Sequence, residues 1–101
     1  MAKGYWIAHV DVADLEGYKA YFAANAEPFA KYGARFLVRS GRSALKEGAL
    51  RDRHVVIEFK DYPTAIACYE SAEYRRALAI RQQVSRGDLV IIEGYDGQQP
   101  A

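Results

Sequence analysis

The sequence lacks several features that would mark whole classes of protein. It has a single cysteine, Cys68, which excludes an intramolecular disulfide and fits a reducing, cytoplasmic environment. No stretch approaches the roughly 18 apolar residues of a membrane span, and the start of the chain has no signal-peptide core. We therefore expect a cytoplasmic protein that has no membrane as a partner.

An excess of charge of one sign is also lacking. The 14 basic and 13 acidic residues are mixed along the chain and give a net charge of +1. Because there is no basic stripe, nucleic acid is not an expected partner. The 101 residues are enough for one domain with one core, which we predict over residues 1–96, followed by a flexible tail over residues 97–101.

What the sequence does contain is a strong β-strand pattern at residues 53–60, a β-branched run that includes the carboxylate Glu58. Side chains alternate across a strand, so Val55, Ile57 and Phe59 should face one side. His54 and Glu58 should face the other. An acid within a mostly apolar strand marks either a structural salt bridge or a functional site.

The remaining elements follow from their periodicity. A strand is expected over residues 3–12, and a helix over residues 15–32 that is capped by Asp14 and kinked or interrupted in its last turns by Pro28. A strand over residues 34–40 should form a long hairpin with the central strand, with a bulge at Ser40 and Gly41 and a tip near Gly48. Two short helices, or one broken helix, should cover residues 62–84, before a last strand over residues 89–95.

This order of elements predicts an α+β, ferredoxin-like βαββαβ fold, a four-stranded antiparallel sheet with its helices on one face. The helix-free face would be partly apolar, which is too much apolar surface to leave in water. We therefore expect a homodimer in which two sheets close into a dimeric α+β barrel. The apolar residues assigned to that face are Ile7, Leu37, Val56, Leu89 and Ile91.

Short motifs along nearly the whole chain also indicate a family. They are Tyr-Trp-Ile at residues 5–7, Tyr-Gly-Ala-Arg-Phe-Leu-Val-Arg-Ser-Gly at 32–41, Val-Ile-Glu-Phe at 56–59, Ser-Ala-Glu-Tyr at 71–74, Arg81, and Val-Ile-Ile-Glu-Gly at 90–94. Together they resemble the bacterial domain of unknown function family 1330. That family is similar to the dimeric α+β barrel superfamily, which includes cofactor-free monooxygenases, isomerases and stress-response proteins.

The resemblance implies a scaffold and does not imply a particular reaction. The residues that match the family pattern are Arg39, Glu58, Tyr74, Arg81 and Glu93. The chain departs from the pattern at backbone positions, with Ala34 and Ser40 where glycine is usual and Ala72 where proline is common.

Four polar residues, His9, Arg39, Glu58 and Glu93, are expected on the helix-free face, where they could line a pocket inside the barrel. The hairpin tip would place Arg39 opposite Glu58, although the bulge could shift the register by one residue and separate them. As chemistry, Glu58 would be a general base, His9 a proton carrier and Arg39 an anchor for a carboxylate or enolate oxygen. As structure, Arg39 and Glu58 would form a buried ion pair beside His9.

Three residues of the helices are further ligand-binding candidates. Asn25 lies within the apolar stripe of the first helix, where it could orient a ligand or be satisfied by the backbone or by water. Tyr74 and Arg81 share a buried-looking face of a later helix. They could contact an anionic ligand, or Arg81 could pair with an acid.

No cofactor and no metal are assigned. The weak alternative is a zinc or iron site made by His9 with Glu58 and Glu93. Cys68, which lies between apolar neighbours, is expected to be an inert core thiol.

Two classes of function follow from the sequence. In the first, the barrel binds a small organic metabolite in its polar pocket and carries out acid–base chemistry on it without a cofactor. In the second, the chain is a non-catalytic binding or stress-associated module whose polar face is structural at the dimer interface.

Overall fold

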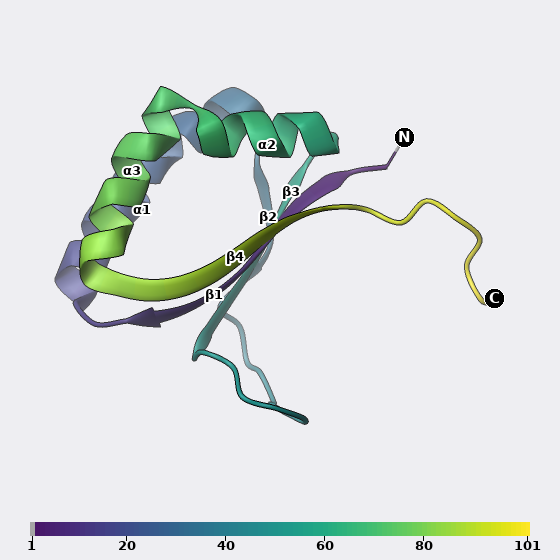
Figure 1. Ribbon diagram of the computed structural model, residues 1–101, viewed down its shortest axis with the longest axis horizontal. Coiled ribbons are helices and arrows are strands. Elements are labelled where there is room, and N and C mark those ends of the chain that lie inside the picture. The colour runs from purple at the N-terminus through teal and green to yellow at the C-terminus, as the bar shows by residue number, and fades with distance from the viewer. Residues whose placement is uncertain (1) are drawn as a thin grey trace.

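Three helices cover one face of a four-stranded sheet in the computed structural model, which describes residues 2–101 (Figure 1). The elements are β1 (Gly4–Val12), α1 (Leu15–Tyr32), β2 (Arg35–Arg39), β3 (Arg53–Phe59), α2 (Tyr62–Glu70), α3 (Ala72–Val84) and β4 (Ser85–Glu93). Neighbouring strands are antiparallel in the order β2-β3-β1-β4. The predicted α+β sheet architecture is confirmed.

The ends of α1 form for local reasons. The Asp14 carboxylate accepts a hydrogen bond from the backbone N–H of Gly17 at 3.1 Å, which satisfies an amide of the first turn. Gly33 ends the helix in the left-handed conformation, with φ of 69°. Of the kink or interruption predicted at Pro28, the interruption is wrong, because α1 continues through this buried residue to Tyr32.

Ser71 separates α2 from α3, which confirms the predicted break. The backbone of Ser71 is extended. Its hydroxyl donates a hydrogen bond to the carbonyl of Cys68 at 2.7 Å and accepts one from the N–H of Tyr74 at 3.1 Å. One side chain therefore closes α2 and caps α3. As a result, the Tyr74 side chain is directed into the core from the first turn of α3.

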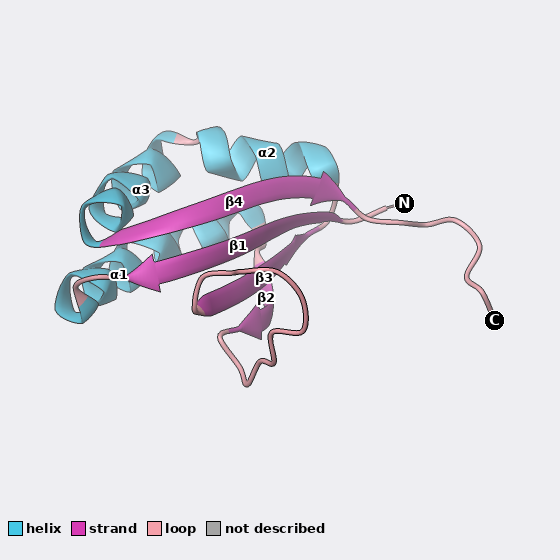
Figure 2. Cartoon of the chain, turned by 60° about the horizontal axis from the view of Figure 1, so that its bottom comes forward, coloured by secondary structure: helices cyan, strands magenta, loops and turns pink. Residues whose placement is uncertain are grey.

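Strand β4 is longer than predicted, because it begins at Ser85 directly after α3 and pairs with β1 along its whole length (Figure 2). We call the face under the helices the covered face and the opposite one the open face. Leu89 and Ile91 lie opposite Ala8 and Trp6 and pack against the core on the covered face, so their predicted position on the helix-free face is wrong. Val90 and Ile92 occupy the open face instead, 51% and 47% exposed.

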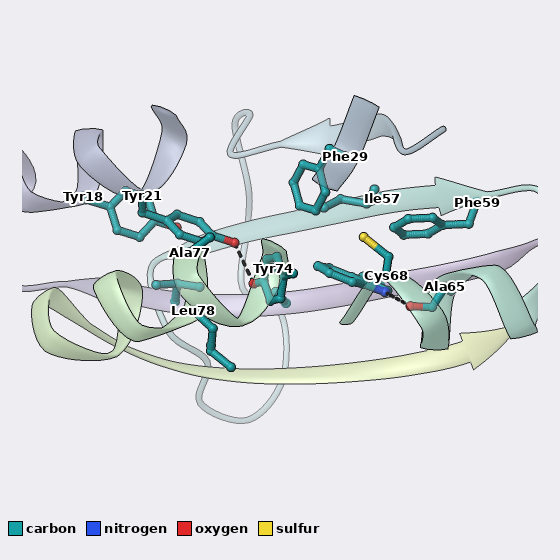
Figure 3. Close-up of a cluster of buried hydrophobic side chains, with 13 residues drawn as sticks. Tyr18, Tyr21, Phe29, Ile57, Phe59, Ala65, Cys68, Tyr74, Ala77 and Leu78 are labelled. Atoms are coloured by element: carbon teal, nitrogen blue, oxygen red, sulfur yellow. Dashed lines mark hydrogen bonds between the residues drawn. The ribbon is translucent and has the colours of Figure 1, made fainter. Parts of the chain in front are cut away.

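The core lies between the sheet and the helices and is rich in aromatic side chains (Figure 3). Trp6 of β1, which is 1% exposed, is at its centre. Its ring centroid lies 4.8 Å from that of Tyr74 and 5.4 Å from that of Phe29, both in edge-to-face geometry. The indole N–H donates to the backbone carbonyl of Ala65 at 2.9 Å, which ties β1 to α2.

The long connection between β2 and β3 extends beyond the sheet (Figure 2). Near its end, the guanidinium group of Arg51 contacts the carboxylates of Asp11 and Asp88, each at 3.0 Å. These ion pairs attach the connection to β1 and β4. Within residues 2–101, none of the helices is long and apolar enough to cross a membrane.

Candidate functional site

A cavity lies between the sheet and helices α1 and α3, on the covered face. Its volume is about 30 Å³, enough for about two water molecules or for the head group of a small ligand. Side chains of β1, β2 and β3 form its floor, and side chains of the two helices form its roof. Most of the lining is apolar, and the aromatic rings that contribute are Trp6, Tyr18, Tyr21, Phe22, Phe29 and Phe36.

Three arginines line the cavity, and aromatic rings lie close to their guanidinium groups. The Cζ atom of Arg39, from β2, lies 4.4 Å from the ring centroid of Phe36 and 4.8 Å from that of Phe22. The Cζ atom of Arg53, from β3, lies 5.3 Å from the Phe22 centroid. Arg81, from α3, is the deepest of the three, with 8% of its surface exposed. Aromatic faces attract these cations but do not neutralise them.

The buried ends of two of these arginines are not fully hydrogen-bonded within the protein. The Nε atoms of Arg53 and Arg81 are buried and have no partner among the described residues. Within residues 2–101, no ion pair involves Arg39, Arg53 or Arg81, and no Asp, Glu or His lines the cavity. Buried charges are normally paired, so this positive cluster is unusual.

Gly87 makes room for Arg81. A Cβ atom at position 87 would lie 2.8 Å from Nη1 of Arg81 and 3.3 Å from a methyl group of Val10. Any larger residue would push the guanidinium group away from the sheet. The glycine therefore allows Arg81 to lie directly against β1 and β4.

The polar groups that accompany the arginines are neutral. The hydroxyls of Tyr21 and Tyr74 are 2.8 Å apart and share a hydrogen bond (Figure 3). Burial raises the pKa of both tyrosines, so both hydroxyls stay protonated near neutral pH. Asn25, 5% exposed, adds an amide to the lining. None of these groups compensates the charge of Arg81.

The position of Arg39 differs from the sequence prediction. Glu58 lies opposite Arg35, four residues before Arg39, and the register then shifts where residues 37 and 38 together oppose Val56. After this bulge, Arg39 lies opposite Val55 and points to the covered face. The predicted pairing of Arg39 with Glu58 is therefore wrong, and the two side chains are on opposite faces, the alternative that a bulge allows.

His9 and Glu58 lie on the open face, as predicted, but they are not neighbours. The Nδ1 atoms of His9 and His54 are 2.8 Å apart, whereas Glu58 lies opposite Tyr5. Four residues along a strand separate His54 from Glu58, roughly 13 Å. The acid–base roles of His9 and Glu58 stay predictions, but the two side chains do not share a site within one chain.

Glu93 does not join them. It lies at the end of β4 opposite Gly4, a residue of the covered face, and is exposed. His9 lies opposite Asp88 on the same strand pair. Among the residues that the structure describes, no group of three or more metal-ligating side chains is present, so the set of His9, Glu58 and Glu93 is not assembled.

Cys68 belongs to the core. Its side chain is fully buried, and burial raises the pKa of the thiol to about 12. Its sulfur is 3.9 Å from the carbonyl oxygen of Pro28. The prediction of a buried core thiol is confirmed.

Sequence reasoning selected Asn25, Arg39 and Arg81 of the lining but missed Arg53 and Tyr21. The signal for Arg53 was present, because alternation places it on the same face as Val55. An arginine on the apolar face of a strand is the same kind of conflict as the glutamate that was selected.

Comparison with known proteins agrees with this fold. The family model described as "Domain of unknown function (DUF1330)" matches residues 3–95. The chain belongs to the DUF1330 family. The predicted family membership is thereby confirmed. No curated protein matches this DUF1330 chain.

Three solved structures share the fold of the DUF1330 chain. A protein of unknown function from Rhodopseudomonas palustris is 13% identical, with a TM-score of 0.73, covering 95% of this chain and 85% of that one. SnoaB, a cofactor-independent oxygenase from Streptomyces nogalater, is 14% identical, with a TM-score of 0.64 and complete coverage of both chains. A dimeric ferredoxin-like protein of unknown function from Thermobifida fusca is 19% identical, with a TM-score of 0.58, covering 91% and 89%. At these identities the likeness concerns the fold alone.

Proposed function

We propose that this protein binds a small organic molecule in the cavity between the sheet and helices α1 and α3. The observation that carries the proposal is the pair of buried nitrogens, Nε of Arg53 and Nε of Arg81, that have no hydrogen-bond partner in the described part of the protein. Buried donors are nearly always satisfied in folded proteins. A ligand with acceptor atoms would accept a hydrogen bond from each of these two nitrogens.

The other walls of the cavity support an organic ligand over an inorganic one. Apolar and aromatic side chains make up most of the lining, which is typical of small-molecule sites with a few polar groups. Arg39 is exposed at the edge of the cavity, where a long flexible side chain is able to move aside. The enclosed volume then holds the ligand's polar end, and the remainder extends toward Arg39.

The proposal is of binding and does not include turnover. A reaction that begins with proton abstraction needs a base within hydrogen-bond reach of the ligand. In the described chain, the lining has neither a carboxylate nor an imidazole, and Tyr21 is held protonated by its raised pKa. SnoaB is described as an oxygenase, but this cavity has no identified base that would support such a reaction.

We also infer that the open face packs against a second copy of the chain. Val38, Val90 and Ile92 lie on this face with 42%, 51% and 47% of their surfaces exposed, next to Ile7 and Val56. β-Branched residues grouped on one sheet face favour burial. The neighbour from Thermobifida fusca is described as dimeric, which supports a homodimer with this geometry.

Thermal denaturation tests the binding proposal. The melting temperature of the full chain is measured with a panel of small organic acids, phenols, alcohols and amides, and we expect at least one compound to raise it in proportion to the logarithm of its concentration. Ala8 lines the cavity, so Ala8→Leu should fill the space and abolish the shift. The exposed Ala23→Leu on α1 is the matched control. A panel in which no compound raises the melting temperature would refute the proposal.

A further inference from the structure

We propose that the group recognised in this cavity is a carboxylate, held between Arg53 and Arg81 above Val10. This inference rests on the proposed function, because it names the chemical class of the bound molecule. The two arginines come from different elements, β3 and α3, and line the same cavity.

The strand register fixes that point. Val10 of β1 lies opposite Arg53 on β3 and opposite Gly87 on β4. Neighbouring strands are about 4.8 Å apart, so Arg53 and Gly87 flank Val10 at similar distances. Arg81 reaches the sheet over Gly87, the one flanking position without a side chain. The two guanidinium groups therefore approach the space above Val10 from opposite sides.

The charge around that space is positive and uncompensated. Arg39, Arg53 and Arg81 bring three cations to a lining in which, over residues 2–101, there is no acidic side chain. The chain does pair an arginine elsewhere, since Arg51 contacts both Asp11 and Asp88. Leaving a buried cation without a counter-ion destabilises a fold, so the arrangement favours an anion supplied from outside.

A carboxylate suits this space better than other anions. Guanidinium groups match the planar, two-oxygen geometry of a carboxylate, and such bonds are among the strongest that neutral or charged donors make. The cavity of about 30 Å³ accepts the three heavy atoms of a carboxylate group. The apolar lining around Phe22, Phe29 and Phe36 would contact a hydrocarbon or aromatic body, which inorganic phosphate lacks.

The neutral tyrosines complete the site. Tyr21 and Tyr74 hold two hydroxyl protons and use one of them in their shared hydrogen bond. When Tyr74 is the donor in this bond, the proton of Tyr21 is free, and Tyr21 is the one of the pair that lines the cavity. A carboxylate would accept a hydrogen bond from this hydroxyl, whereas the three arginines would repel an ammonium ligand.

The test compares acids with their own neutral amides on the wild-type chain at low ionic strength. Acetate, butyrate and benzoate are each paired with acetamide, butyramide and benzamide, and inorganic phosphate is added as a purely inorganic anion. We expect at least one carboxylate to raise the melting temperature, with no shift from its amide and none from phosphate at the same concentration. This comparison needs no variant, so it cannot be confounded by a failure to fold.

Three outcomes of that comparison overturn the inference. If amides stabilise as well as acids, small-molecule binding stands and the carboxylate assignment falls. If phosphate matches the best carboxylate, the site attracts anions in general. If none of these compounds has any effect, the carboxylate assignment falls, and the proposed function falls with it when the wider panel is also without effect.

Variants then locate the effect. Arg53→Met and Arg81→Met keep the side-chain stem and remove the charge. Each should weaken the binding of the carboxylate by about tenfold or more. Arg51→Met removes the same charge outside the cavity and should leave the affinity unchanged. Equal losses in all three variants would show a long-range effect of charge and would contradict a site between Arg53 and Arg81. Arg81→Lys serves if Arg81→Met does not fold.

Discussion

Arg51 and Arg53 are two positions apart, yet the protein treats their charges in opposite ways. Arg51 bridges two carboxylates, Asp11 and Asp88, at the surface. Arg53 points into the core, where its nearest partners are the rings of Phe22 and Tyr18. The chain has 13 acidic residues available and places none of them in the described lining of the cavity. The contrast shows that the cavity is positive by arrangement and not for lack of acids.

The largest loss of stability is expected from a substitution on the covered face, where the side chains are most closely packed. Trp6→Ala removes a side chain that is 1% exposed and should lower the free energy of unfolding by about 3–5 kcal/mol, since large-to-small changes leave a cavity. If a second copy covers the open face as proposed, Val90→Ala should cost about 1 kcal/mol, in a manner that depends on protein concentration. Urea denaturation at two protein concentrations measures both. A Val90→Ala effect below about 0.5 kcal/mol at every concentration would mean that this face stays in water.

Burial on the covered face should also appear as a loss of stability in alkali. The pKa of Cys68 is raised to about 12 in the folded state, so the unfolded chain loses this proton first. Stability is therefore complete below about pH 9 and falls as the pH rises toward 12, with a slope of about 1.4 kcal/mol per pH unit for one proton. Around pH 9, where the tyrosines are still largely protonated, Cys68→Ala should remove most of this slope. Equal slopes in the variant and the wild type would contradict the assignment.

The smallest effects are expected from the arginines themselves, measured without ligand. Arg51→Met loses two partly exposed ion pairs, which solvent screens, and should cost little stability. Arg81→Met replaces a buried cation that lacks a counter-ion, so the free energy of unfolding should stay the same or rise by about 1 kcal/mol. Chemical denaturation of both variants tests the contrast. A clear loss of stability in Arg81→Met would show that the fold already satisfies this guanidinium group.

Much of the fold could be predicted because its signals are local. Asp14 and Ser71 cap their helices through their own side chains, and the periodicity of β1 and β3 reports which residues share a face. The start of β4 was missed because residues 85–88 contain no apolar side chain, although pairing with the end of β1 keeps this segment extended. Tertiary pairing overrode local preference there.

Arg39 was placed on the wrong face because its position depends on register. Alternation assigns faces correctly only while no residue is inserted, and the bulge at residues 37 and 38 reverses the assignment of Arg39. The connection over residues 40–52 is too long for its turn to fix the alignment of β2 with β3. The register is therefore set by the pairing of the two strands themselves. Arg81, by contrast, was found on its buried stripe, because helical periodicity is not affected by strand register.

The bulge in β2 also decides whether residue 39 belongs to the cavity. Ser40, at φ of 57°, ends the strand after Arg39. A regular strand of the same length would place Leu37 opposite Val56 and Arg39 opposite His54, on the open face. Deletion of one residue within the bulge would instead keep Arg39 opposite Val55, because the residues that follow the bulge already pair regularly. Counting residues along β2 would therefore assign the equivalent side chain of another family member to the wrong face.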